Sequence, residues 1–260
     1  MTTDIIPLLL AVVSGGVVAL LLTLFGGGGS VLAVPLLLYV VGVADPHIAI
    51  GVAAAGVALN ALTALAGHAR AGRVRWPCAT LFATTGAAGA WIGSSLAKII
   101  DGHQLLLIFA AAMAAVAISM LRPGVAVVRP EPRLNWAMSP RVSVAGAGVG
   151  SAAGFFGIGG GFLIVPGLMA STGMSLATAQ ATSLLSVAAF GATTAGNYAL
   201  SGWIDPGLVA AMAVGGAVGT LAGLPLARRL GAKAALGRTL FAGLILVVAV
   251  YVAFRSVVEL

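Results

Sequence analysis

The chain has 260 residues, of which 60% are apolar and 7% are charged, and its mean hydropathy is +1.14. A water-soluble domain of this composition would lack the polar surface needed to cover itself, so soluble classes of protein are excluded. The formal net charge of +7 is compatible with nucleic-acid binding by its sign alone. The basic residues lie in short clusters between apolar runs, however, which is typical of the cytoplasmic loops of a membrane protein. We therefore expect no nucleic-acid partner.

Apolar runs recur along the whole chain and predict an all-α, polytopic membrane helix bundle, since a spanning helix needs about 20 mostly apolar residues. Segments 30–43 and 161–174 are short and would rise only about 20 Å as helices, against a hydrocarbon core of about 30 Å. We expect them to be half-helices or arms of re-entrant hairpins, which gives eight to ten membrane segments. In chain order the segments are 5–25, 30–43, 47–69, 77–98, 104–121, 141–156, 161–174, 176–199, 206–228 and 235–256.

Three clusters of basic residues determine the expected orientation. If the N-terminus is outside, all three lie on the inner side, whether the chain crosses eight or ten times. We therefore expect a multi-pass protein of a bacterial inner membrane with both termini on the periplasmic side. Lys98 and Arg255 are the basic residues outside the clusters. The clusters are Arg70, Arg73 and Arg75; Arg122, Arg129, Arg133 and Arg141; and Arg228, Arg229, Lys233 and Arg238.

The second half of the chain repeats the first. Gly26–Pro35 (GGGGSVLAVP) matches Gly157–Pro166 (GIGGGFLIVP), and Gly86 matches Gly216 after a slip of one position. We divide the chain into a first membrane repeat (1–121), a proline-rich cytoplasmic linker (122–140) and a second membrane repeat (141–260). Each half contains an odd number of crossings, so the repeats are predicted to be inverted, an architecture that recurs in secondary transporters.

The two Gly-rich turns are the first candidate site. Irregular backbone at membrane depth is tolerated only where protein or a water-filled cavity satisfies it. A helix that starts after such a turn directs its free N–H groups and positive dipole end toward the turn, which suits an anion. The alternative is that the glycines only allow helices to pack closely, as we expect for Gly89, Gly93, Gly219 and Gly223. We predict substrate binding near the midplane by Gly28, Gly29, Ser30, Gly159, Gly160 and Gly161.

Polar side chains at helical spacing within 47–69 and 176–199 are predicted to face the interior of the bundle. Asn60, Thr182 and Ser183 are the candidates for contact with the substrate, and the alternative is that they hold helices together. His68 lies beside the first basic cluster. It is either an interfacial histidine or a carrier of a coupled proton.

Other chemistry has no matching pattern in the sequence. All acidic residues fall at segment ends, in loops or at the termini, so no carboxylate is placed to couple transport to a cation. A phosphate-binding loop, a nucleophile elbow and a Cys/His cluster with metal-ligand spacing are absent. We expect no enzymatic activity, no cofactor and no metal. The membrane potential alone could drive the outward movement of an anion.

The paired turns, together with Ala179–Ser183 (AQATS) and His68–Trp76 (HARAGRVRW), resemble the sulfite exporter TauE/SafE family of bacterial inner-membrane permeases. The resemblance covers nearly the whole chain. It implies export of a small sulfur-containing anion, either sulfite or an organosulfonate such as sulfoacetate. We expect alternating access from the inverted repeats, with one repeat rocking against the other. The first half has Gly51-Val52 where the second half has Thr182-Ser183, so the two halves cannot contribute equally to a polar lining.

The expected partners are a small anionic substrate and membrane lipid, and a homo-oligomer is left open. A passive anion channel and a transporter of another small carboxylate or oxyanion are the alternatives. A membrane-embedded structural role is disfavoured, because such a role does not require two equivalent Gly-rich breaks.

Overall fold

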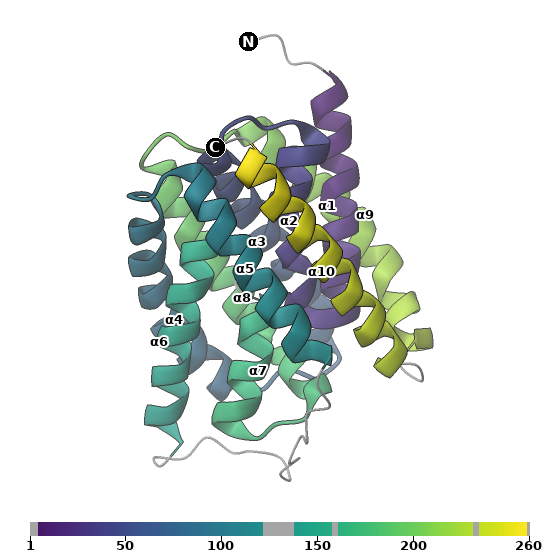
Figure 1. The fold of residues 1–260 in the computed structure, drawn as a ribbon. Helices are drawn as coiled ribbons and strands as arrows, with labels where there is room; N and C mark the ends of the chain where they lie inside the picture. The colour runs from purple at the N-terminus through teal and green to yellow at the C-terminus, as the bar shows by residue number, and fades with distance from the viewer. Residues whose placement is uncertain (1–4, 122–137, 158–160, 231–233, 259–260) are drawn as a thin grey trace.

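The structure is a computed structural model that describes residues 5–121, 138–157, 161–230 and 234–258. Throughout these residues the chain is helical, with short connections and no strand (Figure 1). The prediction of an all-α bundle is therefore confirmed. In chain order the elements are α1 (Ile5–Phe25), the 3₁₀-helical segment η1 (Gly26–Leu32), α2 (Ala33–Leu36), the π-helical segment η2 (Leu37–Val41), α3 (Pro46–Arg70), α4 (Trp76–Ala97), α5 (Gly102–Leu121), α6 (Ser139–Phe156), α7 (Gly161–Thr172), α8 (Leu176–Ala199), α9 (Pro206–Leu230) and α10 (Ala234–Val258).

Several of these helices have the properties of membrane spans. Within the described residues, α1, α3, α8 and α9 contain stretches long and apolar enough to cross a membrane, and shorter apolar stretches lie in η1–η2, α5, α7 and α10. Large apolar side chains such as Val144 of α6 and Val247 of α10 are 74% and 68% exposed. Apolar surface of this kind faces lipid in a membrane protein. The fold is that of a helical membrane bundle.

Local sequence sets the helix ends. The Asp45 side chain accepts a hydrogen bond from the His47 backbone N–H (2.7 Å), and Pro46 occupies the first turn of α3, where no backbone donor is needed. Gly42 (φ 85°) and Gly157 (φ 66°) end η2 and α6 in the left-handed conformation that favours glycine. These residues separate the short segments from the long helices.

The two short segments fold back on the helices that precede them. The η1 and η2 segments pack against α1, and α7 packs against α6. Each is therefore the second arm of a hairpin, which is one of the two forms expected from the sequence. The short segment of the first half is not one regular helix, since it passes from a 3₁₀ to an α to a π segment.

The halves of the chain interlock. Helix α4 packs against α6 and α1 packs against α9, while α3 pairs with α8 and α5 with α10. A Cβ at Gly89 would overlap the Ala147 carbonyl oxygen, and one at Gly219 would overlap the Gly16 carbonyl oxygen. The expected packing role of these two glycines is confirmed. Both crossings thus join a helix of the first half to a helix of the second.

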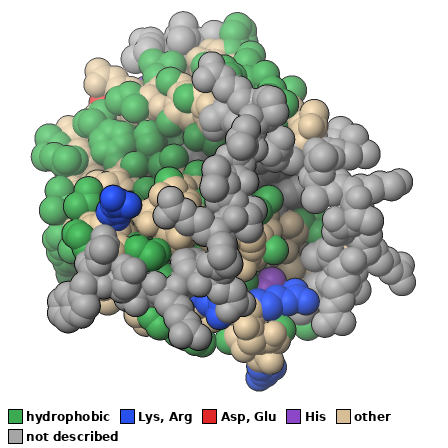
Figure 2. Space-filling model, turned by 90° about the horizontal axis from the view of Figure 1, so that it is seen from below, with side chains coloured by type: hydrophobic (Ala, Val, Ile, Leu, Met, Phe, Trp, Pro, Cys, Tyr) green, Lys and Arg blue, Asp and Glu red, His purple; other side chains and the backbone are tan. Residues whose placement is uncertain are grey.

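The ends of the bundle differ. Helix α1 begins and α10 ends at one end of the molecule, whereas α5 ends and α6 begins toward the other (Figure 1). Figure 2 views the second end and shows Lys and Arg side chains and a histidine on it. This arrangement is the one that the clustered basic residues predict, and the assignment of the two ends to the two sides of a membrane remains a prediction.

Candidate functional site

The first Gly-rich turn is η1, which contains Gly28, Gly29 and Ser30. Gly29 and Ser30 are buried. A Cβ at Gly29 would overlap backbone atoms of Leu21 and Leu22, so only glycine lets η1 lie this close to α1. The packing explanation therefore holds for Gly29, and binding of an anion by the same backbone remains a prediction.

The second turn follows α6. Gly157 donates its N–H to the Gly154 carbonyl oxygen (3.2 Å), and a Cβ at Gly157 would overlap the side chain of Ile50 on α3. Gly161 is buried at the start of α7. Gly159 and Gly160 lie outside the described residues.

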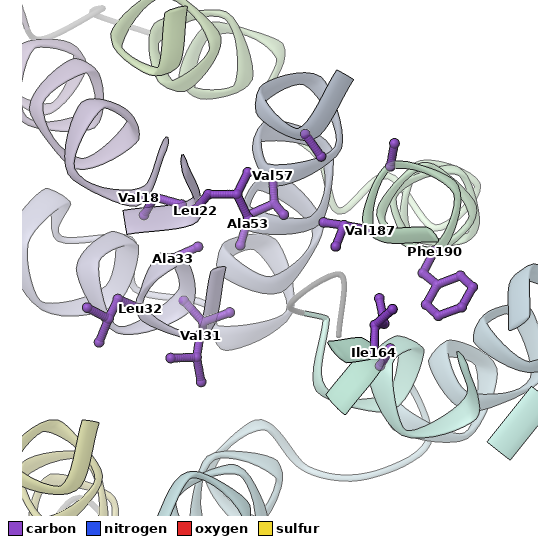
Figure 3. Close-up of a cluster of buried hydrophobic side chains, with 14 of the residues drawn as sticks. Val18, Leu22, Val31, Leu32, Ala33, Ala53, Val57, Ile164, Val187 and Phe190 are labelled. Carbon is purple, nitrogen blue, oxygen red and sulfur yellow. The ribbon is translucent and has the colours of Figure 1, made fainter. Parts of the chain in front are cut away.

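The first Gly-rich turn lies beside the helix that follows the second turn, because η1 packs against α7. Figure 3 shows the buried apolar cluster at this place, with side chains from α1, η1, α2, α3, α7 and α8. Close-packed apolar side chains exclude water and strengthen any polar interaction made among them. The labelled residues are Val18, Leu22, Val31, Leu32, Ala33, Ala53, Val57, Ile164, Val187 and Phe190.

Asn60 is the polar group that stands out beside this cluster. It lies one turn after Val57 on α3, is 1% exposed, and packs against Gly216 of α9. Neither Nδ2 nor Oδ1 of its amide has a hydrogen-bond partner. A buried polar group without a partner costs about 1–3 kcal/mol, so an amide with two such atoms needs an explanation beyond packing. The Thr63 hydroxyl donates to the backbone carbonyl oxygen of Asn60 (2.7 Å) and lies 3.5 Å from the Thr220 hydroxyl.

The equivalent place in the other half is apolar. Gly86 matches Gly216 in the repeat, and a Cβ at Gly86 would overlap the ring of Phe190, just as one at Gly216 would overlap the amide of Asn60. Phe190 stacks on Phe82, with ring centroids 6.2 Å apart. The same helix contact is therefore filled by an aromatic ring in one half and by an amide without partners in the other.

Thr182 and Ser183 make their hydrogen bonds elsewhere. Both are fully buried on α8. The Thr182 hydroxyl accepts from the Arg75 backbone N–H (3.2 Å), and the Ser183 hydroxyl donates to the Gln180 carbonyl oxygen (2.8 Å). The Thr182 bond holds the α3–α4 connection against α8, the Ser183 bond lies within α8, and neither joins these residues to Asn60. Their part in substrate binding remains a prediction.

His68 lies at the end of α3, half-buried, and its Nδ1 has no hydrogen-bond partner. Its carbonyl oxygen accepts from the Arg73 backbone N–H (3.2 Å). Both readings of His68, an interfacial histidine and a carrier of a coupled proton, stay predictions. In the part of the chain that the structure describes, no three His, Cys, Asp or Glu side chains are grouped to hold a metal ion.

The structure contains a polar network around Lys98 and Asn197 that the sequence did not predict. The Lys98 ammonium, at the end of α4, donates to the Asn197 carbonyl oxygen (3.0 Å), to Asn197 Oδ1 (2.8 Å) and to the Ser201 hydroxyl (2.8 Å). Asn197 Nδ2 donates in turn to the hydroxyls of Ser94 (2.7 Å) and Ser95 (2.9 Å). In the sequence, Lys98 is notable because it lies outside the three basic clusters. Nothing in the sequence pairs it with a residue on α8.

Comparison with known proteins gives a consistent result. Residues 11–252 match the family model described as "Sulfite exporter TauE/SafE". Proteins from two strains of Xylella fastidiosa, each named "Probable membrane transporter protein", are 44% identical over 228 residues, which is 87% of this chain and 87% of each relative. No solved structure matches. The family match covers nearly all of the bundle, including both hairpins and Asn60, and this chain belongs to the sulfite exporter TauE/SafE family of membrane transporters.

Proposed function

We propose that this transporter exports a small sulfur-containing anion, either sulfite or an organosulfonate such as sulfoacetate. The observation that carries the proposal is the Asn60 amide, which is buried against Gly216 of α9 with neither of its polar atoms bonded. An amide nitrogen offers two N–H donors, and an oxyanion accepts them. Binding of the anion would recover the hydrogen bonds that the buried amide lacks.

The hairpins supply the second part of the proposed site. Backbone N–H groups at the start of α7 and in η1 add donors and the positive ends of short helices. Gly28, Gly29 and Ser30 would act from the first turn, and Gly159, Gly160 and Gly161 from the second. Apolar packing around this place keeps water away, so few donors suffice to hold one charge.

The proposed movement is alternating access of two inverted repeats. Helix pairs α1–α9 and α4–α6 each join the two halves through closely packed glycines. Two equivalent interfaces of this kind allow one half to rock against the other with little change inside either. Phe190 fills the contact at Gly86 and the Asn60 amide fills the contact at Gly216. The two halves would therefore contribute unequally to substrate binding.

The proposed driving force is the membrane potential. Within the described residues the carboxylates of Asp45, Asp101 and Asp205 lie at helix starts, where each accepts a backbone N–H two positions on. None of the three lies within the bundle interior where a coupled cation would be carried. Moving one negative charge outward across a membrane with a negative interior releases about 2.3 kcal/mol per 100 mV.

The test is flux in proteoliposomes of the full chain loaded with sulfite, sulfoacetate, sulfate or lactate. We expect saturable efflux of sulfite or sulfoacetate that is faster when the lumen is negative and is accelerated by counterflow. Asn60→Ala should reduce that efflux at least about tenfold, the value of one hydrogen bond to a charged group. Phe190→Leu, at the equivalent place, should leave most of it.

Each other outcome has a definite meaning. Negligible movement of all four anions would reject the proposal. Preference for lactate or sulfate would make the chain a transporter of another small carboxylate or oxyanion. Flux without saturation or counterflow would make it an anion channel.

A further inference from the structure

A cavity with a partly polar lining lies at the end of the bundle where α10 ends. It has a volume of about 180 Å³ and is formed where η2, the start of α3, the start of α5 and the end of α10 come together. Its polar lining comes from Tyr39, His103 and Arg255. A water molecule occupies about 30 Å³ in the liquid, so the cavity can hold a small oxyanion together with some of its hydration.

The cationic group of this cavity is held in place by aromatic rings. The Arg255 guanidinium lies 5.8 Å from the centroid of the Tyr39 ring, and Tyr39 packs edge-to-face on Tyr251 at 5.1 Å. A guanidinium positioned over an aromatic ring keeps a defined orientation, and its planar set of N–H donors matches the oxygens of an oxyanion.

His103 adds a second donor. Its Nδ1 is buried and has no hydrogen-bond partner, although the imidazole is part of the cavity lining. An imidazole always carries at least one N–H. An oxyanion inside the cavity would accept a hydrogen bond from an N–H of the ring that faces the cavity.

Two carboxylates near the cavity along the described chain serve as helix caps. Asp101 accepts from the His103 backbone N–H (2.9 Å), and Asp45 accepts from the His47 backbone N–H (2.7 Å). Neither of the two belongs to the cavity lining. Among the described residues that line the cavity, the side chains are one cation, one imidazole, one phenol and apolar groups.

The position of the cavity relates it to the hairpins. The broken segment that begins at the first Gly-rich turn ends at Gly42, and its last residues, Leu38 and Tyr39, line the cavity. One end of this segment thus lies at the packed hairpins and the other at the cavity. The cavity is at the end of the bundle where α1 begins (Figure 1), which the basic clusters predict to be the outer side. Arg255 is one of the basic residues that do not follow the charge pattern, so orientation in the membrane does not explain it.

We propose that Arg255, His103 and Tyr39 form an outer binding site for a small oxyanion, where the exported anion rests before it leaves. This inference rests on the proposed function. The same chemistry would attract the phosphate of a lipid headgroup, and the small volume favours a free anion.

A chemical protection experiment tests binding independently of transport. Phenylglyoxal modifies accessible arginines, and peptide mass spectrometry of the full chain in detergent measures the modification of Arg255 and Arg73. Sulfoacetate, which unlike sulfite does not react with the reagent, should slow modification of Arg255 in a saturable manner and leave Arg73, which is exposed in the α3–α4 connection, unchanged. Equal rates at Arg255 with and without sulfoacetate would overturn the proposal. Protection by added phosphatidylglycerol and not by sulfoacetate would assign the site to lipid, which also overturns it.

Flux in oriented vesicles tests the role in export. With sulfite on the outer face, Arg255→Gln should raise the half-saturation concentration about tenfold, the value of a lost hydrogen bond to a charged group. Sulfite on the inner face should give little change. Arg255→Lys should also weaken outer-face affinity, because an ammonium lacks the planar set of N–H donors. Arg73→Gln should match the wild type on both faces. His103→Gln, tested in parallel, should also weaken outer-face affinity. This second variant tests the site if the Arg255→Gln protein does not accumulate in the membrane. Equal effects from both faces would reject the outer site. Absence of wild-type flux together with protection of Arg255 would instead reject the proposed function and keep the site.

Discussion

The amide of Asn60 packs directly against the α-carbon of Gly216, at a point where any side chain at Gly216 would occupy the same space as the amide. Helices α3 and α9, which come from different halves of the chain, approach each other there. The glycine makes room for the amide, and the amide has no hydrogen-bond partner. Close packing and a buried polar group without a hydrogen-bond partner therefore occur at one contact.

This contact gives a prediction with a built-in control. Gly216→Ala places a methyl group on the Asn60 amide, and Gly86→Ala places one on the ring of Phe190. Both should cost about 1–3 kcal/mol of stability through overpacking. Only Gly216→Ala displaces the proposed ligand contact, so we expect it to lower anion flux much more than Gly86→Ala at equal protein amounts. Thermal unfolding in detergent measures the first effect and proteoliposome flux the second. Equal loss of flux in the two variants would count against Asn60 as a substrate contact.

The network around Lys98 predicts a large effect on stability. Lys98→Met keeps the aliphatic stem and removes three hydrogen bonds from the ammonium to groups on and after α8. A hydrogen bond to a charged group contributes about 1.5–3 kcal/mol, and partial exposure of Lys98 reduces the sum, so we expect a loss of about 2 kcal/mol. Thermal unfolding in detergent is the measurement. Thr84→Val on the same helix is the control, because the Thr84 hydroxyl bonds only to carbonyl oxygens of its own helix. A Lys98→Met protein as stable as the control would show that the network does not hold α4 to α8.

The second hairpin depends on a glycine with positive φ. Gly157→Ala adds strain of about 1–2 kcal/mol from the left-handed conformation, together with overlap of about 1–3 kcal/mol against Ile50. Gly202→Ala has a similar φ of 74° but no neighbouring atom within 4 Å, so only the strain applies. We therefore expect Gly157→Ala to destabilise the protein by about 2 kcal/mol more than Gly202→Ala, measured as the difference in unfolding free energy. Equal destabilisation would mean that α6 and α3 adjust around the new methyl group.

The inverted repeat predicts opposite accessibility of equivalent turns. Cys78 is the only cysteine and is 1% exposed, so a Cys78→Ala chain gives a background without reactive thiols. Ala71 and Ser201 are equivalent, exposed residues in the α3–α4 and α8–α9 connections. A membrane-impermeant maleimide added to intact cells should label Ser201→Cys and not Ala71→Cys, and inverted vesicles should give the reverse. Labelling of both positions from one side would disprove the inversion.

Much of the fold could be predicted from local properties of the sequence. The length and apolar character of Ile5–Phe25 and of 176–199 determine that they are membrane helices, because lipid leaves backbone groups no partner outside the segment. The short runs after the glycines were identified by length, and the paired motifs identified the family. Each of these features depends on neighbouring residues alone.

The tertiary structure decided what those segments contact. Lys98 and Asn197 are 99 positions apart, and Thr182 and the Arg75 N–H are 107 positions apart, so no local pattern indicates that they meet. Thr182 shows the limit of such patterns. A polar residue inside a membrane segment suggests a ligand contact, but the sequence does not show whether a backbone donor already satisfies it, as the Arg75 N–H does for Thr182. Asn60 became the stronger candidate only because helices from the two halves interlock and leave its amide enclosed by α9 without a donor or an acceptor. Whether a buried polar atom is satisfied depends on the atoms that packing brings around it, and packing is a property of the whole bundle.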